Sequence, residues 1–364
     1  MKKNPIKRRK YFIIKFKLIS PLLRRDESLK QKILKDYFYL HQSNSKNCMR
    51  IILLFIIAAQ VLVSCAQESQ NWDKEILEVK QDDSTNFVIN ADGIFIDRWD
   101  QLPQPQFWKV IMRMSPDSIL INSAKNRDIL LKIAVNDWNK LSESKKATIK
   151  DSLRNAFGLN PDATLNCTTG KNHFYNFDAV YPSISKGVEA FHKNGVDPWY
   201  AQSILLIESP GQLKKSNVGA YGAFQLMPSV ARKYGLIVND VKDEREDFQK
   251  SAIAAASLIK KSCIPSAKRL LNLYNLTYNE TDIWFRLFVL HVYHAGAGNI
   301  EAVLTKIKPT SGGQTLITTM WQTTAGQFGN SSQNYSQLAL AAQLILHEMV
   351  YKNCDSLENY SGKM

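Results

Sequence analysis

The sequence predicts an all-α protein, with a larger helical domain that follows a smaller helical region. The first observation is that apolar residues recur three and four positions apart, as at Val180, Ile184 and Val188, which places them on one face of a helix. The second is that the C-terminal half has no alternating apolar and polar run of the kind that predicts a strand. With 45% hydrophobic and 22% charged residues among 364, the chain can bury a sizeable core.

The basic charge of the chain is concentrated at its N-terminus. Residues 1–64 contain 15 Lys/Arg and 3 Asp/Glu, a net charge of +12 out of +14 for the whole chain, which leaves +2 for residues 65–364. We expect this basic segment to be removed. The rest of the chain then lacks the basic surface typical of a nucleic-acid binder, so we predict no nucleic-acid partner.

Residues 1–65 are predicted to be a targeting segment. The apolar run 51–59 follows Met49–Arg50 and precedes small residues, which is typical of a secretory signal and too short for a comfortable membrane span. Leu62–Val63–Ser64–Cys65 resembles a bacterial lipobox, which implies that Cys65 is lipidated and anchors the protein in the cell envelope, on an outer membrane facing the periplasm. An uncleaved anchor is the alternative. Residues 1–48 are long for a signal, so translation can also begin at Met49.

Residues 66–98 are expected to form a polar tether, and residues 99–176 a helical region. Phe107, Trp108 and Ile111 recur at helical spacing, as do residues of the segment 129–138. Ser142 is a predicted cap for a further helix that stops at Gly158.

The larger domain is expected at residues 177–352, followed by a tail at 353–364. Asp197 as N-cap and Pro198 as the first helical residue predict a helix that ends at Glu208. Further helices are predicted at 251–259, after Thr281 or Asp282 up to Tyr293, and at 333–352.

Glu208 ends an apolar run, Ile204–Ile207, and no Asp or Glu occurs between Ser209 and Asn239. Partial desolvation should raise the pKa of this carboxyl above its free value of about 4.3. A carboxyl that stays protonated near neutral pH can act as a general acid. Three glycines follow in the loop 209–222, where backbone can approach a ligand.

These residues carry a family resemblance. The pattern E-S followed by S-x-x-G-A-x-G-x-x-Q-x-M-P-x-x-A resembles that of the soluble-type lytic transglycosylases, whose catalytic domain has the goose-type lysozyme-like fold. It is matched by Glu208–Ser209, Ser216, Gly219–Ala220, Gly222, Gln225, Met227–Pro228 and Ala231. A second family block, Y-N-A-G-x-G, corresponds to Tyr293–Gly298, and a tyrosine entering the last helix corresponds to Tyr335.

The resemblance implies a reaction and a set of roles. Glu208 would be the catalytic acid and base that cleaves the MurNAc–GlcNAc β-1,4 bond of peptidoglycan strands and leaves 1,6-anhydro-MurNAc ends. It implies no cofactor and no metal. Read alone, Gln225 is a surface amide and Met227 a core residue; for Tyr335 the core and site readings are equal. The substrate-binding residues implied are Ser216, Gly222, Gln225, Met227, Tyr293 and Tyr335.

Two functional alternatives stay open. One is a goose-type lysozyme-like hydrolase, which needs a second acid to position water, and the cluster Asp243–Asp247 is its nearest source. Otherwise this cluster is predicted to be a solvated face or a helix start. The other alternative is a catalytically silent peptidoglycan-binding lipoprotein.

His294 departs from the family, where asparagine follows this tyrosine. With His291 it makes an i, i+3 pair, but no carboxylate or cysteine at helical spacing completes a metal site, so a structural histidine is favoured. Three cysteines remain beyond the targeting segment. We predict a disulfide between Cys263 and Cys354, with Cys167 as a free thiol; sequence does not fix this connectivity.

Overall fold

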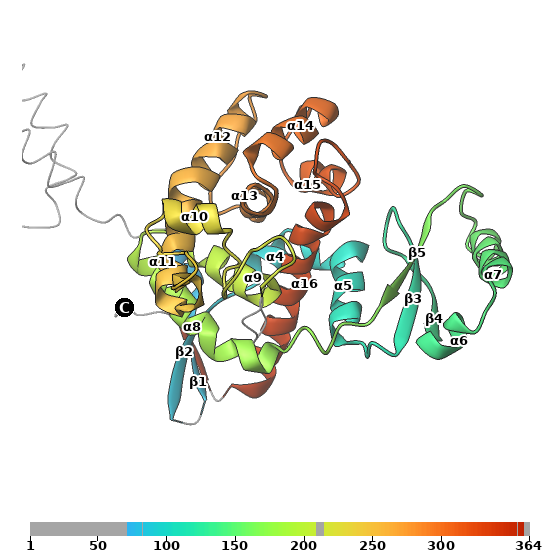
Figure 1. Cartoon of the computed structure of the whole chain (residues 1–364), viewed down its shortest axis with the longest axis horizontal. Helices are drawn as coiled ribbons and strands as arrows, with labels where there is room; N and C mark the ends of the chain where they lie inside the picture. The colour runs from blue at the N-terminus through green and yellow to red at the C-terminus, as the bar shows by residue number, and fades with distance from the viewer. Residues whose placement is uncertain (1–70, 82, 209–214, 355, 360–364) are drawn as a thin grey trace, which may run out of the picture. The chain divides into compact units, whose positions relative to one another are not determined.

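The computed structural model describes residues 71–81, 83–208, 215–354 and 356–359. They belong to one compact unit, Asn71–Met364, shown in Figure 1. The expectations for residues 1–65, including the lipidated Cys65 and a start at Met49, lie outside the described residues. Within the described part of the chain, no helix is both long and apolar enough to cross a membrane.

A fully buried helix, α9 (Pro198–Glu208), lies at the centre of the helical body. Every residue from Pro198 to Ile207 is buried, and a helix that is apolar on all sides must be covered on all sides. Helices α8 (Phe177–Lys193) and α16 (Asn330–Asn353) pack against it. The backbone N–H of Trp199 donates to Asp197 Oδ1 at 2.9 Å, which confirms the predicted cap.

The remaining helices of the body surround α8, α9 and α16. The helices predicted around 251–259, after Asp282 and at 333–352 are confirmed. Helix α13 crosses α16 and carries a second block of the predicted site. The helices are α10 (Pro228–Lys233), α11 (Phe248–Leu258), α12 (Ile264–Asn272), α13 (Ile283–Ala295), α14 (Ala297–Ile307) and α15 (Gln314–Met320). A π-helix, η5 (Ile259–Cys263), joins α11 to α12.

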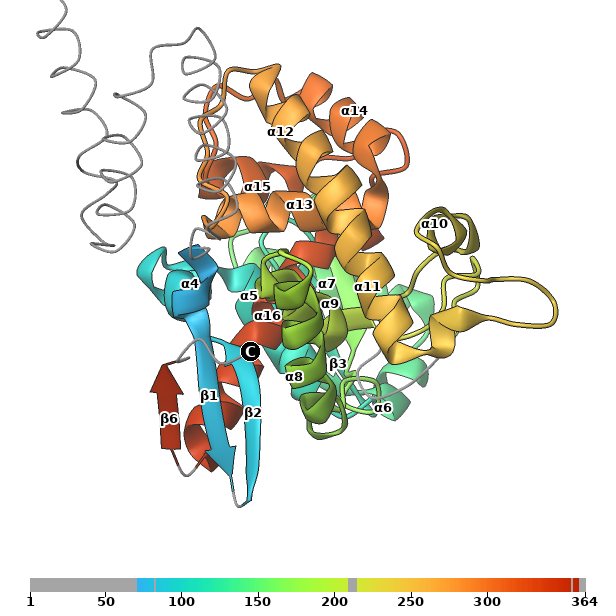
Figure 2. The same ribbon diagram turned by 90° about the vertical axis from the view of Figure 1, so that its left-hand side faces the viewer.

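The protein is predominantly helical, as predicted, but it is not all-α, because in the described residues two three-stranded antiparallel sheets accompany the helices. One has the order β2-β1-β6 and the other the order β4-β3-β5; the first is seen in Figure 2. A five-residue run such as 129–133 fits a helix face and a strand equally well, so periodicity alone could not distinguish them. The strands are β1 (Ile76–Gln81), β2 (Ser84–Ile89), β3 (Ser118–Ser123), β4 (Ile129–Ala134), β5 (Leu165–Thr169) and β6 (Ser356–Asn359).

The predicted tether and tail are also wrong for the residues described. Residues 71–98 fold onto the helical body through η2 (Asn71–Glu75), β1, β2 and α4 (Asp92–Ile96), and Ile76 and Ile94 are wholly buried in its core. The side-chain amide of Gln202 on α9 accepts a hydrogen bond from the backbone N–H of Ile89 at 2.8 Å and donates one to its carbonyl oxygen at 2.9 Å. In the tail, β6 pairs with β1.

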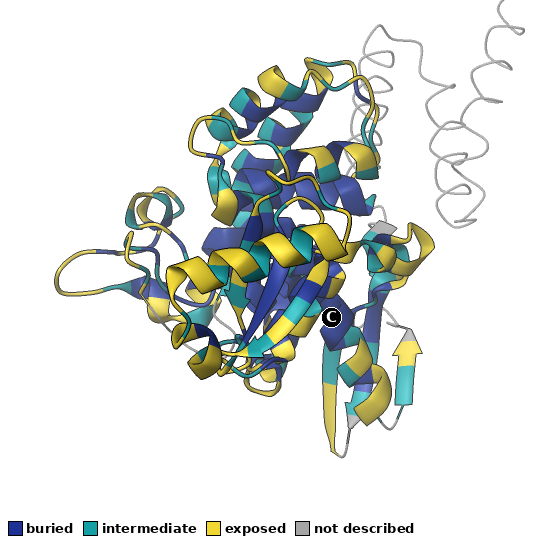
Figure 3. Cartoon of the chain, turned by 90° about the vertical axis from the view of Figure 1, so that its right-hand side faces the viewer, coloured by how far each residue is buried: buried dark blue, intermediate teal, exposed yellow. Residues whose placement is uncertain are grey.

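A small lobe is inserted between α5 (Pro103–Arg113) and α8. It consists of β3, β4 and β5 with α6 (Val135–Asn139) and α7 (Glu143–Ala156), and it has a core of its own around Ile121 and Trp138. Ser142 caps α7 as predicted, but α7 buries no residue (Figure 3). The lobe joins the body through Arg127, which donates to Asn334 Oδ1 on α16 at 2.8 Å. Residues 99–176 are therefore a mixed α/β region.

The predicted disulfide is not formed. Cys263 is buried in the main core, Cys354 follows the end of α16, and Cys167 lies exposed on β5; all three are free thiols. Burial raises the pKa of the Cys263 thiol to about 12, so this group is an inert core residue.

Candidate active site

Glu208 is the last residue of α9 and is half-buried. Burial raises the pKa of its carboxyl to about 7, against the lowering effect of one hydrogen bond. The C-terminal end of a helix also disfavours negative charge, which acts in the same direction as burial. The predicted upward shift is confirmed, and its cause is the predicted one.

Tyr335 makes the hydrogen bond to Glu208. Its hydroxyl donates to Glu208 Oε1 at 2.7 Å, and its ring is 4% exposed. Tyr335 lies in the second turn of α16, and α16 packs along α9. Tyr335 is therefore a core residue whose hydroxyl contacts Glu208.

Tyr293 lies on α13 and supports the loop of residues 216–227, which is called the glycine loop below. Its hydroxyl donates to the backbone oxygen of Phe224 at 2.6 Å. It is close enough to Glu208 for the carboxylate, together with burial, to raise the pKa of the phenol well above its usual range. The charge of Glu208 thus acts on Tyr293, whereas the hydrogen bond of Tyr293 goes to the loop.

The glycine loop is a tight turn that only glycine can build at Gly222. The backbones of Tyr221 and Leu226 exchange two hydrogen bonds of 3.2 and 3.1 Å, which close the turn. Gly222 has φ of +84°, and a Cβ there would lie 2.0 Å from the carbonyl oxygen of Arg245. Gln225 has φ of +45° and donates from Nε2 to the carbonyl oxygen of Gly222 at 3.0 Å. The hydrogen bond of the Gln225 side chain therefore stabilises the turn.

Ser216 and Met227 occupy the two ends of this loop. Ser216 Oγ accepts from the backbone N–H of Ala220 at 2.9 Å, so the side chain closes the turn 216–220. Met227 precedes Pro228, the first residue of α10, and remains 39% exposed. An exposed thioether beside the loop offers an apolar contact for a ligand.

Arg245 holds the loop from beneath and is a residue that sequence reasoning missed. Its guanidinium is 1% exposed and donates to the carbonyl oxygens of Gly219 at 2.7 Å and Leu226 at 2.9 Å. Asp243 binds it through both carboxylate oxygens, at 2.8 and 2.6 Å. The guanidinium also lies 5.5 Å from the centre of the Tyr221 ring.

The predicted solvated face at Asp243–Asp247 is therefore wrong at its centre. Glu244 is buried with Arg245 and pairs with Lys242 at 2.8 Å and Lys250 at 2.6 Å. A backbone hydrogen bond from Ile237 and these lysines lower the pKa of Glu244 to about 2. The helix-start alternative is confirmed at Asp247, which caps α11.

Tyr175 is a second residue that the sequence did not reveal. It lies just before α8 in an aromatic segment, where its ring stacks on Phe177 at a centroid distance of 6.2 Å. Burial and the nearby charge of Glu208 raise the pKa of Tyr175. The cluster of aromatic residues at 174–177 was the only local signal, and it is typical of any core.

The two histidines of α13 both face α16. His291 is wholly buried and its Nε2 lies 2.8 Å from Ser336 Oγ. The ring of His294 stacks on that of Tyr335, with centroids 4.2 Å apart and planes 21° apart. Over the described ranges, no group of three His, Cys, Asp or Glu side chains is arranged to hold a metal ion.

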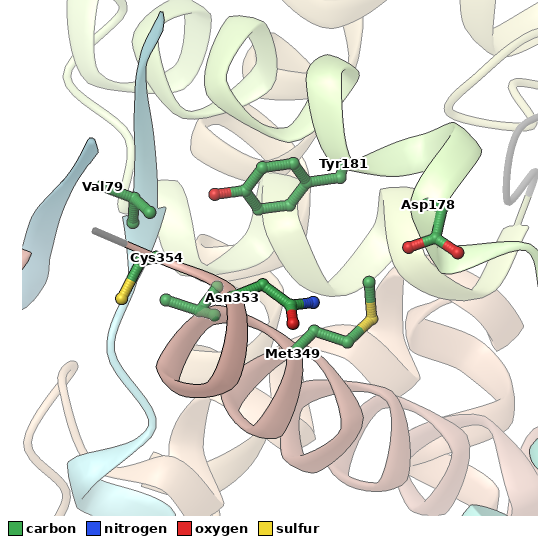
Figure 4. A pocket seen from close by; sticks show the side chains of 7 residues that line it. Val79, Asp178, Tyr181, Met349, Asn353 and Cys354 are labelled. Carbon is green, nitrogen blue, oxygen red and sulfur yellow. The ribbon is translucent and has the colours of Figure 1, made fainter. Parts of the chain in front are cut away.

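A cavity of about 110 Å³ lies elsewhere, between β1, α8 and the C-terminal end of α16 (Figure 4). Tyr181, Met349 and Cys354 are among its lining residues. Met349 is 14 residues beyond Tyr335 on the same helix, so about 21 Å separates them along its axis. This cavity is therefore not part of the site around Glu208.

Comparison with known proteins identifies the region that contains Glu208. Residues 188–310 match the family model described as the transglycosylase SLT domain. This segment, about a third of the chain, includes the glycine loop and Tyr293, whereas Tyr335 lies beyond it. A search of curated proteins finds no match for the chain.

Proposed function

We propose that the protein is a lytic transglycosylase that acts on peptidoglycan, because residues 188–310 match the model of the transglycosylase SLT domain. It cleaves the β-1,4 bond between MurNAc and GlcNAc without water and leaves 1,6-anhydro-MurNAc ends. The observation that carries the proposal is the Glu208 carboxyl, whose pKa burial raises to about 7 and whose Oε1 accepts the Tyr335 hydroxyl.

In the first step, protonated Glu208 gives its proton to the glycosidic oxygen, and the C1–O bond of MurNAc breaks. The GlcNAc unit leaves with a free 4-hydroxyl group. The acetamido oxygen of the same MurNAc stabilises the oxocarbenium-like centre, so the substrate supplies the group that a second enzyme carboxylate supplies in other glycosidases.

In the second step, the Glu208 carboxylate takes the proton of the MurNAc C6 hydroxyl as that oxygen bonds to C1. The proton returns to Glu208, no water is consumed, and the acid is regenerated. A pKa near 7 suits a group that must both give and take a proton at neutral pH. The Tyr335 hydrogen bond stabilises the carboxylate between the two steps.

The loop contacts favour this reaction over hydrolysis. A hydrolase needs a second acid to activate water, and the segment Asp243–Asp247 was its nearest candidate source. Asp243 is bound to the Arg245 guanidinium, and Glu244 to two lysines. Asp243 supports the loop through Arg245, and Glu244 is held by the two lysines and the backbone N–H of Ile237, so neither carboxylate is available as a base.

The loop beside Glu208 would orient the glycan. The turns closed by Ser216 and Gly222 present backbone groups, and exposed Met227 offers an apolar contact. Fixed turns lower the entropic cost of aligning the bond with the acid.

We further propose that a lipidated Cys65 anchors the enzyme in the bacterial envelope, on an outer membrane facing the periplasm. The support is the lipobox-like sequence before Cys65. More than one acyl chain would give firm anchoring without a spanning helix.

The test of the reaction is mass spectrometry of purified sacculi digested with the protein lacking residues 1–65. The expected products end in 1,6-anhydro-MurNAc and are lighter by one water than hydrolysis products. Reducing-end products would establish a hydrolase, and intact sacculi would establish a binding protein.

A further inference from the structure

Two histidines on consecutive turns of α13 hold two consecutive residues of α16. His291 Nε2 lies 2.8 Å from Ser336 Oγ, and Trp321 Nε1 donates to the same hydroxyl at 2.7 Å. These three side chains are buried. They fix the backbone of α16 one residue beyond Tyr335.

His294 acts on the ring of Tyr335 itself. A tyrosine has a broad second side-chain torsion, so a fixed backbone alone does not fix the direction of its hydroxyl. The stacked imidazole, 4.2 Å from the phenol ring and 21° from its plane, restricts that rotation. The same phenol donates to Glu208 Oε1 at 2.7 Å.

We propose that His294 is a positioning residue, which holds the Tyr335 phenol so that its hydroxyl stays directed at Glu208. The inference rests on the proposed function of Glu208 as acid and base. The related family pattern has asparagine at this position, and an amide has no ring to stack on the phenol.

The surroundings keep the imidazole neutral while Glu208 titrates. His294 is exposed, yet partial desolvation of its imidazole lowers its pKa to about 4. The ionisable groups shown beside it are Tyr335, on whose ring it stacks, and His291, one turn earlier on α13. His291 is also neutral, because burial lowers its pKa to about 3.

The first test is a double-mutant cycle on sacculus digestion by the full chain in detergent. His294→Ala should lower kcat roughly two- to ten-fold, the range expected for one aromatic pair, and leave KM unchanged. His294→Phe should restore kcat, whereas His294→Asn should not. In a Tyr335→Phe background, His294→Ala should cause no further loss. Additive losses, or a loss confined to KM, would overturn the proposal.

The second test does not depend on activity. The pKa of Glu208 is measured by carboxyl ¹³C NMR, with the resonance assigned by its loss in Glu208→Gln. The Tyr335 hydrogen bond lowers this pKa, so His294→Ala should raise it and His294→Phe should leave it in place. An unchanged pKa in His294→Ala would refute the positioning role even if sacculi were not cleaved.

The matched control is His347→Ala. His347 on α16 also makes aromatic contacts, which are tilted, with Phe95 on α4 and Tyr351 on α16. It lies 12 residues beyond Tyr335, about 18 Å along the helix. This variant should change neither kcat nor the pKa of Glu208; a change of the same size as that in His294→Ala would show a general effect of helix packing and overturn the proposal.

Discussion

A Cβ atom on Gly222 would lie 2.0 Å from the carbonyl oxygen of Arg245. The guanidinium of the same arginine binds the loop carbonyls on either side of that glycine, at Gly219 and Leu226. Arg245 therefore both supports the turn and leaves no room in it for a side chain. The shape of the loop beside Glu208 depends on this one packed contact.

Gly222→Ala should consequently destroy the turn. The substitution adds the cost of a positive φ, about 1–3 kcal/mol, to a clash with rigid backbone. We expect activity to fall at least a hundredfold and the Tm to fall by several degrees. Gly298→Ala is the stability control, because a Cβ there meets nothing within 4 Å. An active, stable Gly222→Ala enzyme would contradict the account of the loop.

The N-terminal segment is tied to the catalytic helices by a buried ion triad. Arg286 Nη1 lies 2.7 Å from Glu75 Oε2, and Arg286 Nε lies 2.7 Å from Asp197 Oδ2. Asp197 caps α9, the helix that carries Glu208. Residues 71–75 are thus part of the support for the site.

We expect Glu75→Gln to lower the free energy of unfolding by about 1–3 kcal/mol, because a buried guanidinium loses a charged partner. Asp197→Asn should cost about 3–5 kcal/mol, since Asp197 is itself more deeply buried than Glu75. Urea unfolding followed by circular dichroism measures both. Glu143→Gln, which breaks an exposed pair with Lys146, should cost far less than either, because solvent screens that pair. Equal losses of unfolding free energy in the three variants would show that the ion pairs of Arg286 contribute no more than an exposed ion pair.

The sequence revealed those parts of the site whose neighbours are adjacent in the chain. The apolar residues that raise the pKa of Glu208 immediately precede it, so its environment could be predicted. Arg245 could not be found in this way. It is flanked by four acids, which suggests a solvated segment, while its partner Gly219 is 26 residues away.

The strands were missed for a related reason. Their runs are at most six residues long, and Ile129 and Ile133 satisfy helical spacing as well as strand spacing. The buried partners of β2 and of the preceding η2, Gln202 and Arg286, lie more than 100 residues away. Pairings over such separations leave no local signal in one sequence.

The proposed anchor predicts a change of location on substitution of Cys65. Cys65→Ser should prevent lipidation, so the protein should move from the membrane fraction to the soluble fraction or accumulate unprocessed. Fractionation with immunoblotting, and mass spectrometry of the mature N-terminus, measure this. Cys167→Ser, in the small lobe, is the control and should stay membrane-bound. A Cys65→Ser protein that remains in membranes, with residues 49–64 attached to the wild type, would indicate a helical anchor.

The pH dependence of cleavage should follow the protonation of Glu208. Its acid form starts the reaction, so the rate should fall as pH rises above about 7, the pKa that burial produces. Tyr335→Phe removes the hydrogen bond that lowers this pKa. Tyr335→Phe should therefore shift the alkaline fall of the pH–rate profile to higher pH and also lower kcat. If the pH of this fall is unchanged in Tyr335→Phe, a group other than Glu208 determines it.

Glu208→Gln should separate catalysis from stability. Activity should fall by about 10²–10⁴-fold, because the amide neither gives nor takes a proton, while substitution of the exposed Glu246 by Gln should leave activity unchanged.

The folded pKa of Glu208, about 7, lies above its ordinary value of 4.5, so the native state binds this proton more tightly than the unfolded state. That advantage is complete below pH 4.5 and is lost as pH rises through 7. Glutamine stays neutral, so Glu208→Gln should match the wild-type Tm at pH 4 and exceed it at pH 8. An inactive variant that is also less stable at pH 8 would mean that the carboxyl is ionised and held by favourable contacts, and Glu208 could not then be the acid.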